Sequence, residues 1–261
     1  AKLADQQGKN RFEAVFYGKA GKKLVPENQE QTQAILDAIL GKDFIITKVK
    51  KGTKQRRPFA PFTTSTLQQD AARKLGFTTK RTMAVAQGLY EGVKLSESET
   101  VGLITYMRTD STRVSTEAQH AAREQIIKQY GAEYAPEKFN VYAGRKNAQD
   151  AHEAIRPTYV ERTPASIKEK LTADQYKLYQ LIHSRFLASQ MTPARYENMS
   201  YELEVEGYTF RASFSKLVFN GFKAAYDVQM EEDESQNKTM PPMVEGDSCK
   251  ALKIEPKQNF T

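Results

Sequence analysis

Apolar and polar residues alternate imperfectly over residues 11–19, and more regularly over residues 201–214, a period of two that predicts β-strands. A strand is also predicted over residues 43–51, which carry Phe44, Ile45, Ile46 and Val49. Between residues 51 and 201, apolar side chains recur every three to four positions, as on one face of a helix. The pattern changes near residue 60 and again near residue 192. Strands therefore bracket a helical middle, which predicts an α+β fold.

The simplest domain organisation for this pattern is a discontinuous β-rich domain built from residues 1–59 and 192–261. A helical domain, residues 60–191, is then inserted between the two parts. Pro58 and Pro61 punctuate the first boundary, after a flexible basic stretch.

Capping residues predict where the helices begin, because a side-chain oxygen there accepts a free amide of the first turn. The predicted starts are Asn28 for a helix to Leu40, Ser65 with Gln68 for a helix to Leu75, Thr79 for a helix to Tyr90, Ser115 or Thr116 for a helix to Tyr130, and Thr172 with Gln175 for a helix to Gln190. The second and third of these helices are short and closely spaced, as in a helix-turn-helix motif, although an ordinary helical hairpin has the same pattern.

The last part of the chain is again strand-like. We expect a strand over residues 223–230, a polar acidic loop over residues 231–239 and a final strand pair over residues 244–256.

The segment from Gly102 to Ser111 changes from apolar to polar within a few residues, and Tyr106 and Arg108 lie at the change. In an extended backbone these two side chains project to the same face. A phenol and a guanidinium placed together provide a nucleophile and a fixed cation, which is what attack on a phosphodiester requires. The alternative is a strand tyrosine next to a surface arginine.

Of the three histidines, His152 has the most informative surroundings. Residues 151–158 are expected to form a short helix stopped by Pro157, so that His152 and Arg156 share one face and form an anion site. Surface or packing roles suit His120 and His183. No histidine or cysteine lies at metal-ligand spacing, so a zinc site is not expected.

The formal net charge of +7 favours a polyanionic partner, with nucleic acid first and an anionic membrane surface second. Cys249 is the only cysteine, which excludes intramolecular disulfides and fits a reducing, cytoplasmic setting. No apolar run approaches membrane-spanning length and no signal peptide opens the chain.

These residues suggest a mechanism in which Tyr106 becomes esterified to a DNA phosphate. A free phenol has a pKa of about 10, and nearby cations favour its ionised form. Such an ester conserves the energy of the cut strand, and the absence of a phosphate-binding Gly-x-x-x-x-Gly-Lys-Ser/Thr loop agrees with resealing without ATP. Cleavage of this kind typically uses Mg²⁺ held by clustered carboxylates. No Asp-x-Asp cluster follows a strand, and the acidic run at residues 231–234 is interpreted as a solvated loop.

Four segments, in the same order, resemble motifs of the type IA DNA topoisomerases, the family of bacterial DNA topoisomerase I. They are Pro-Phe-Thr-Thr-Ser-Thr-Leu-Gln-Gln at 61–69, Gly-Leu-Ile-Thr-Tyr-Met-Arg-Thr-Asp-Ser at 102–111, Ala-His-Glu-Ala-Ile-Arg-Pro at 151–157 and Gln-Met-Thr-Pro-Ala at 190–194. The resemblance covers essentially the whole chain, and the motif at 102–111 is highly specific.

The resemblance implies ATP-independent relaxation of negatively supercoiled DNA by single-strand cleavage, strand passage and religation, with Tyr106 forming a 5′-phosphotyrosyl intermediate. It implies that Arg108 contacts the scissile region and helps to position the phosphate, and that His152 and Arg156 lie on the DNA-facing side of the helical domain. We expect His152, with Tyr106 and Arg108, to be a catalytic residue that supports the phosphate or the leaving group. The resemblance also implies a β-rich arch domain that carries an inserted helical domain of helix-turn-helix (CAP-like) type. The expected DNA-binding residues are Arg108, Thr109, Asp110, Ser111, Arg113, Arg156, Lys80 and Arg81.

The family's acidic Mg²⁺-binding domain and a domain that holds single-stranded DNA are not found in the chain, which opens and closes without natural boundaries. We therefore expect a fragment of a monomeric, nucleoid-associated cytoplasmic enzyme, with no metal site of its own and no relaxation activity alone.

Two alternatives remain. A non-catalytic DNA-binding module also fits the net charge and the helix pair. A tyrosine recombinase also forms phosphotyrosine, but that class needs its arginines and histidine before the tyrosine, whereas His152 and Arg156 follow Tyr106.

Overall fold

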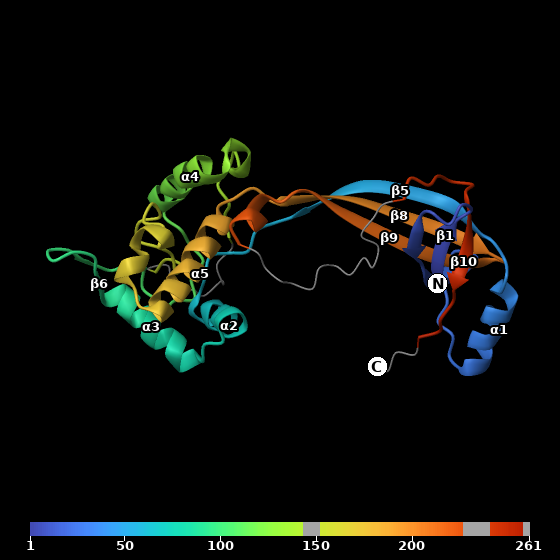
Figure 1. The fold of residues 1–261 in the computed structure, drawn as a ribbon, viewed down its shortest axis with the longest axis horizontal. Coiled ribbons are helices and arrows are strands. Elements are labelled where there is room, and N and C mark those ends of the chain that lie inside the picture. Colours follow the sequence, from blue (N-terminus) through green and yellow to red (C-terminus); the bar gives the residue numbers. More distant parts are fainter. Residues whose placement is uncertain (143–151, 227–240, 258–261) are drawn as a thin grey trace. The chain divides into compact units, whose positions relative to one another are not determined.

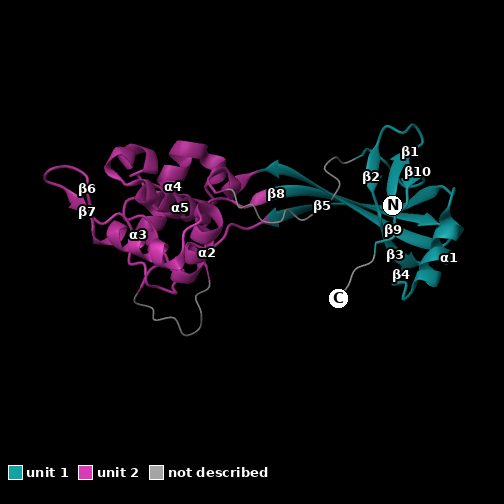
Figure 2. Ribbon diagram, turned by 60° about the horizontal axis from the view of Figure 1, so that its bottom comes forward, with its two compact units in different colours: residues 1–55, 195–219, 229–261 teal, residues 56–194, 220–228 magenta. Residues whose placement is uncertain are grey.

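The computed structural model describes residues 1–142, 152–226 and 241–257. These residues form both helices and a large sheet, which confirms the predicted α+β class (Figure 1). The chain divides into two compact units, coloured separately in Figure 2. Unit 1 contains residues 1–55, 195–219 and 229–261, and unit 2 contains residues 56–194 and 220–228.

Unit 1 is built on an eight-stranded sheet with the order β2-β1-β10-β5-β8-β9-β3-β4. The strands are β1 (Lys2–Asp5), β2 (Arg11–Glu13), β3 (Val15–Lys19), β4 (Lys22–Lys23), β5 (Phe44–Arg56), β8 (Ala194–Val205), β9 (Tyr208–Phe219) and β10 (Ser248–Lys253). Strands β8 and β9 form a long antiparallel hairpin in which Tyr201 pairs with Ala212. Strands β3 and β4 form a short antiparallel hairpin, in which Lys19 pairs with Lys22.

The alternation in β8 and β9 places one side of the hairpin in the core. Tyr201 and Leu203 are buried, as are Phe210 and Phe214 on the paired strand. Helix α1 (Gln29–Ile39) packs against the same core through Ile35 and Ile39. Full burial of a side chain of this size stabilises the fold by about 1.5–3 kcal/mol.

Unit 2 is mainly helical. Its helices are α2 (Thr64–Leu75), α3 (Thr79–Glu91), α4 (Thr116–Tyr130) and α5 (Ala173–Ser189), with 3₁₀ turns η1 (Ala132–Tyr134), η2 (Pro164–Lys170) and η3 (Gly221–Ala224). A two-stranded ribbon, β6 (Val93–Lys94) and β7 (Thr100–Val101), follows α3. Helix α5 is buried on several sides, because Leu178, Ile182 and Phe186 are buried along one face and Leu187 is buried on the far side.

Three predicted helix starts are confirmed and two are wrong. Asn28, Ser115 and Thr172 cap their helices as predicted, and Thr172 forms the predicted box with Gln175. Helix α2 begins earlier than predicted, with Thr63 and Thr66 forming the box instead of Ser65 and Gln68. Helix α3 is capped by Thr78 and not by Thr79. Both errors come from threonine runs, in which several hydroxyls have suitable spacing and tertiary contacts select one.

The predictions for the last strands are corrected in two places. The expected strand over residues 223–230 begins instead with the 3₁₀ turn η3, and residues 227–230 lie outside the described residues. The expected pair over residues 244–256 is one strand, β10, which lies between β1 and β5. The acidic loop over 231–239 also lies outside the described residues.

Candidate active site

Tyr106 lies in an irregular segment and not in a continuous strand. Its apolar half is buried as expected, but its only ladder contact in the described structure is the bridge between Ile104 and Pro157. Beyond it, exposure alternates: Tyr106 and Arg108 reach the surface, while Met107 between them is buried. The phenol and the guanidinium are therefore both accessible to a ligand.

Residues 152–158 are extended, so the prediction of a short helix is wrong. The amide of Ile155 donates to the carbonyl of Phe62 at 2.8 Å, and the amide of Thr105 donates to the carbonyl of Arg156 at 2.9 Å. The segment therefore lies between the entry to α2 and the segment that carries Tyr106. A helix of about six residues is unstable by itself, and Pro157 disfavours helical geometry in the residue before it. The neighbouring segments satisfy the backbone instead.

Thr64, the first residue of α2, fixes the backbone on both sides of Arg108. Its hydroxyl donates to the carbonyl of Met107 at 2.8 Å and accepts from the amide of Thr109 at 2.9 Å. Its own amide donates to the carbonyl of Thr109 at 2.9 Å. The segment at 61–69 is therefore in direct contact with the segment at 102–111.

The Tyr106 ring is held by aromatic contacts. The centroid of the Tyr90 ring lies 5.4 Å away with an interplanar angle of 64°, an edge-to-face arrangement. The His152 ring lies 5.6 Å away at 31°. Tyr106 is 37% exposed, and its hydroxyl forms no hydrogen bond with the described residues. The sequence analysis predicted that His152 and Tyr106 act in the same site, and their rings are in contact in the structure.

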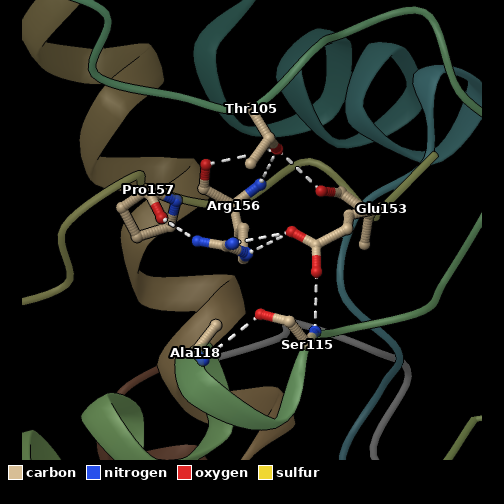
Figure 3. Close-up of polar contacts among 7 residues, drawn as sticks. Thr105, Ser115, Ala118, Glu153, Arg156 and Pro157 are labelled. Atoms are coloured by element: carbon tan, nitrogen blue, oxygen red, sulfur yellow. Dashed lines mark hydrogen bonds and ion pairs between the residues drawn. The ribbon is translucent and has the colours of Figure 1, made fainter.

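Glu153 joins residues 152–158 to the start of α4 through polar contacts (Figure 3). Its Oε2 accepts from the Nε and Nη2 atoms of Arg156 at 3.0 and 2.6 Å, and its Oε1 accepts from the amide of Ser115 at 2.7 Å. The Thr105 hydroxyl donates to the carbonyl of Ala154 at 2.7 Å and accepts from the Arg156 amide at 3.0 Å. The start of α4 is thereby tied to the Tyr106 segment.

This network changes the prediction for Arg156. Its remaining Nη1 donates to the carbonyl of Pro157 at 3.0 Å, and only 14% of its side chain is exposed. Because the segment is extended, His152 and Arg156 do not share a helix face, and the structure does not bring them together as an anion site. Glu153, which sequence reasoning left without a role, is the partner of Arg156, and its spacing of three residues from the arginine was the available signal.

Thr109 and Ser111 were expected to contact DNA, but both are buried. The Thr109 hydroxyl accepts from the amide of Ser111 at 3.0 Å, and the Ser111 hydroxyl accepts from the amide of Arg113 at 3.2 Å. These hydroxyls shape the turn after Arg108 instead of facing solvent. Asp110 and Arg113 remain exposed.

Lys80 and Arg81 lie at the start of α3, away from the contacts described above. Two nitrogens of the Arg81 guanidinium donate to the two carboxylate oxygens of Asp174, each at 2.7 Å. This bond lowers the pKa of Asp174 and places Arg81 against the start of α5. Lys80 is exposed.

The described residues around Tyr106 were expected to contain no metal site. Among the described residues, no group of three or more histidine, cysteine, aspartate or glutamate side chains is arranged to hold a metal ion. The acidic run at residues 231–234 lies outside the described residues. No helix of the described chain has both the length and the apolar character needed to cross a membrane.

The chain is similar to known DNA topoisomerases in both sequence and structure. The family model for DNA topoisomerase matches residues 3–261. The chain is also similar to the solved structure of full-length topoisomerase I from Thermotoga maritima, with 34% sequence identity and a TM-score of 0.72. That match covers 100% of this chain and 41% of the Thermotoga chain.

Proposed function

The chain belongs to the DNA topoisomerase family, and we propose that it supplies the nucleophile of a type IA enzyme that relaxes negatively supercoiled DNA without ATP. The observation that carries the proposal is the surface pair of Tyr106 and Arg108. The phenol and the guanidinium are both exposed and both lack hydrogen-bond partners among the described residues.

In the proposed reaction, the Tyr106 oxygen attacks a backbone phosphorus atom and the bond from phosphorus to the 3′ oxygen breaks. The phenolic proton is lost and the departing 3′ oxygen gains a proton, so that a free 3′-hydroxyl and a 5′-phosphotyrosyl ester result. Arg108 stabilises the charge that develops on the phosphoryl oxygens, and His152 supports the phosphate or the leaving group. Religation is the reverse reaction, and it needs no external energy because the ester conserves that of the cut strand.

The test is Tyr106→Phe in the full-length protein, incubated with end-labelled single-stranded DNA. We expect covalent adducts to disappear while DNA binding is retained. Adducts at the original level would exclude Tyr106 as the nucleophile. Polymerase extension of the released 3′ end then distinguishes a 5′ linkage from the 3′ linkage of a tyrosine recombinase.

The role of His152 has a separate test. His152→Ala should slow cleavage and religation much more than it weakens DNA binding. Equal losses in rate and binding would indicate a role in folding.

We propose that unit 2 is the inserted helical domain, of helix-turn-helix (CAP-like) type, and that unit 1 belongs to the arch domain. The division of the chain into compact units supports this assignment. The proposed partner is single-stranded or negatively supercoiled DNA in the cytoplasm, bound to a monomer at Arg108, Asp110, Arg113 and Lys80.

We further propose that Mg²⁺ and part of the DNA-binding surface come from residues outside this chain, which matches 41% of the Thermotoga protein. The 261 residues alone are then inactive in relaxation. Relaxation of a supercoiled plasmid by the purified chain would contradict this.

The net charge of +7 favours a second candidate, a DNA-binding module without chemistry. It predicts that the full-length protein binds the labelled DNA and forms no adduct, whether or not Tyr106 is replaced.

A further inference from the structure

Tyr90 contacts Tyr106, the nucleophile of the proposed reaction. Its position in the sequence, as one aromatic residue near the end of a helix, did not predict this contact. Tyr90 lies in the last turn of α3 and presents its ring edge-to-face to Tyr106, with 5.4 Å between the centroids. We propose that Tyr90 is a positioning residue that fixes the direction of the Tyr106 phenol toward the phosphate. This inference rests on the proposed role of Tyr106.

The Tyr106 phenol needs such support because its oxygen is not anchored. A half-exposed tyrosine without a hydrogen bond has several side-chain rotamers available, and most of them point the oxygen away from any one phosphate. Attack requires a narrow range of distances and directions. Ring contacts with Tyr90 and His152 restrict the phenol while leaving its oxygen accessible.

The backbone holds Tyr90 itself in place. The amide of Leu103 donates to the carbonyl of Leu89 at 2.8 Å, which joins the end of α3 to the segment that leads to Tyr106. A Cβ atom on residue 102 would lie 2.6 Å from the carbonyl oxygen of Tyr90. A side chain at residue 102 would clash with the backbone of Tyr90, so the glycine that opens the motif permits this close approach of α3 to the Tyr106 segment.

The exposure of Tyr90 distinguishes positioning from core packing. Its side chain is 40% exposed, whereas the apolar residues beside it on α3, Ala86 and Leu89, are fully buried. Removing the Tyr90 ring therefore leaves the core of α3 intact and acts mainly on the Tyr106 ring.

The experiment measures single-turnover formation of the covalent adduct by the full-length protein at saturating single-stranded DNA. We expect Tyr90→Ala to slow adduct formation about fivefold, which is the size of an aromatic pair contribution. Tyr90→Phe keeps the ring and should restore the rate to within about twofold. Tyr90→Leu keeps apolar bulk without a ring and should stay slow. DNA affinity and the melting temperature should not change.

Tyr159→Ala is the matched control, since Tyr159 is 51% exposed in the same unit and its ring contacts Arg162. It should react at the unaltered rate. Gly102→Ala should act like Tyr90→Ala, because it pushes the end of α3 away from Tyr106.

Three results would overturn the inference: an unaltered rate for Tyr90→Ala, a Tyr90→Phe variant as slow as Tyr90→Ala, or a loss of DNA affinity that accounts for the whole effect. Tyr106→Phe, run in parallel, separates the two proposals. If it abolishes the adduct while Tyr90→Ala reacts normally, only the positioning role fails. If it leaves the adduct intact, the proposed function fails first.

Discussion

Two groupings of a tyrosine with an arginine in unit 2, Tyr106 with Arg108 and Tyr226 with Arg185, have opposite surroundings. Tyr106 and Arg108 lie on the surface, without polar partners among the described residues. Tyr226 and Arg185 are buried around Asp70. The Tyr226 hydroxyl donates to Asp70, and Arg185 donates to the same carboxylate oxygen at 3.4 Å and to the carbonyl of Ala60 at 2.7 Å.

The same residue types therefore have different chemical capacities. Burial, and then the neighbouring Asp70, raise the pKa of Tyr226, so that its phenol cannot supply a phenolate near neutral pH. The Arg185 guanidinium lies 4.9 Å from the ring centroids of both Phe59 and Phe62, and its Nε and Nη1 atoms donate to Ala60 and Asp70. The buried grouping stabilises the fold, and the exposed grouping keeps its polar atoms available for a ligand. Mutations in the buried grouping should therefore change stability, and mutations in the exposed grouping should change reactivity.

Arg185→Met should have the largest effect and should act on stability. It leaves the carboxylate of Asp70, whose side chain is only 16% exposed, without its cation and the carbonyl of Ala60 without its donor, which costs about 3–5 kcal/mol of the free energy of unfolding. Urea denaturation measures this. Adding Asp70→Asn should recover part of the loss, because the uncompensated charge is removed. A stable single variant would contradict the structural role of the buried grouping.

Arg108→Ala should have the converse effect. It removes a cation from the proposed phosphate site and should slow adduct formation by about a hundredfold, equivalent to roughly 2.7 kcal/mol. Because the side chain is exposed, the free energy of unfolding should change by less than about 0.5 kcal/mol. Single-turnover cleavage and urea denaturation test the two parts. A normal cleavage rate, or a large loss of stability, would contradict the view that Arg108 acts in the reaction and Arg185 in the stability of the fold.

Glu153→Gln tests whether the network of Figure 3 stabilises the fold, as the buried grouping does. The change weakens the bonds to Arg156 and to the amide of Ser115, so stability should fall by about 1–2 kcal/mol. Glu202→Gln is the matched control, because its pair with Arg211 is more exposed and should contribute under about 1 kcal/mol. Equal effects in urea denaturation would show that the network adds nothing beyond a surface ion pair.

Buried His183 should make the stability of the chain depend on pH, and this is the smallest of the expected effects. His183 is buried, its Nε2 lies 2.7 Å from the carbonyl of Val160, and desolvation lowers its pKa. The unfolded chain therefore takes up a proton at higher pH than the folded chain. The contribution of His183 is complete above the unfolded pKa of about 6.5 and declines as the pH falls below it, by at most about 1.4 kcal/mol per pH unit.

Denaturation at pH 7.5 and at pH 5 measures this decline, and His183→Gln should reduce it. If His183→Gln has the same slope as the unaltered chain, another group causes the decline.

Local signals in the sequence determined the parts of this protein that depend on neighbouring residues. Asn28 and Thr172 cap their helices through amides three residues ahead, so their spacing was sufficient. The alternation around Tyr201 identified a half-buried strand for the same reason. The motif at 102–111 pointed to the family, and the family comparison agrees.

Tertiary structure alone decided the rest, because the deciding partners are distant in sequence. Residues 152–158 became extended since their hydrogen-bond partners lie at Phe62 and in the Tyr106 segment. The side chain of Arg156 is largely buried and binds Glu153 and the carbonyl of Pro157. No local sequence pattern predicted the contact between Tyr90 and Tyr106. A sequence prescribes which polar groups a segment carries, but burial and the choice of partner follow from the packing of the whole unit.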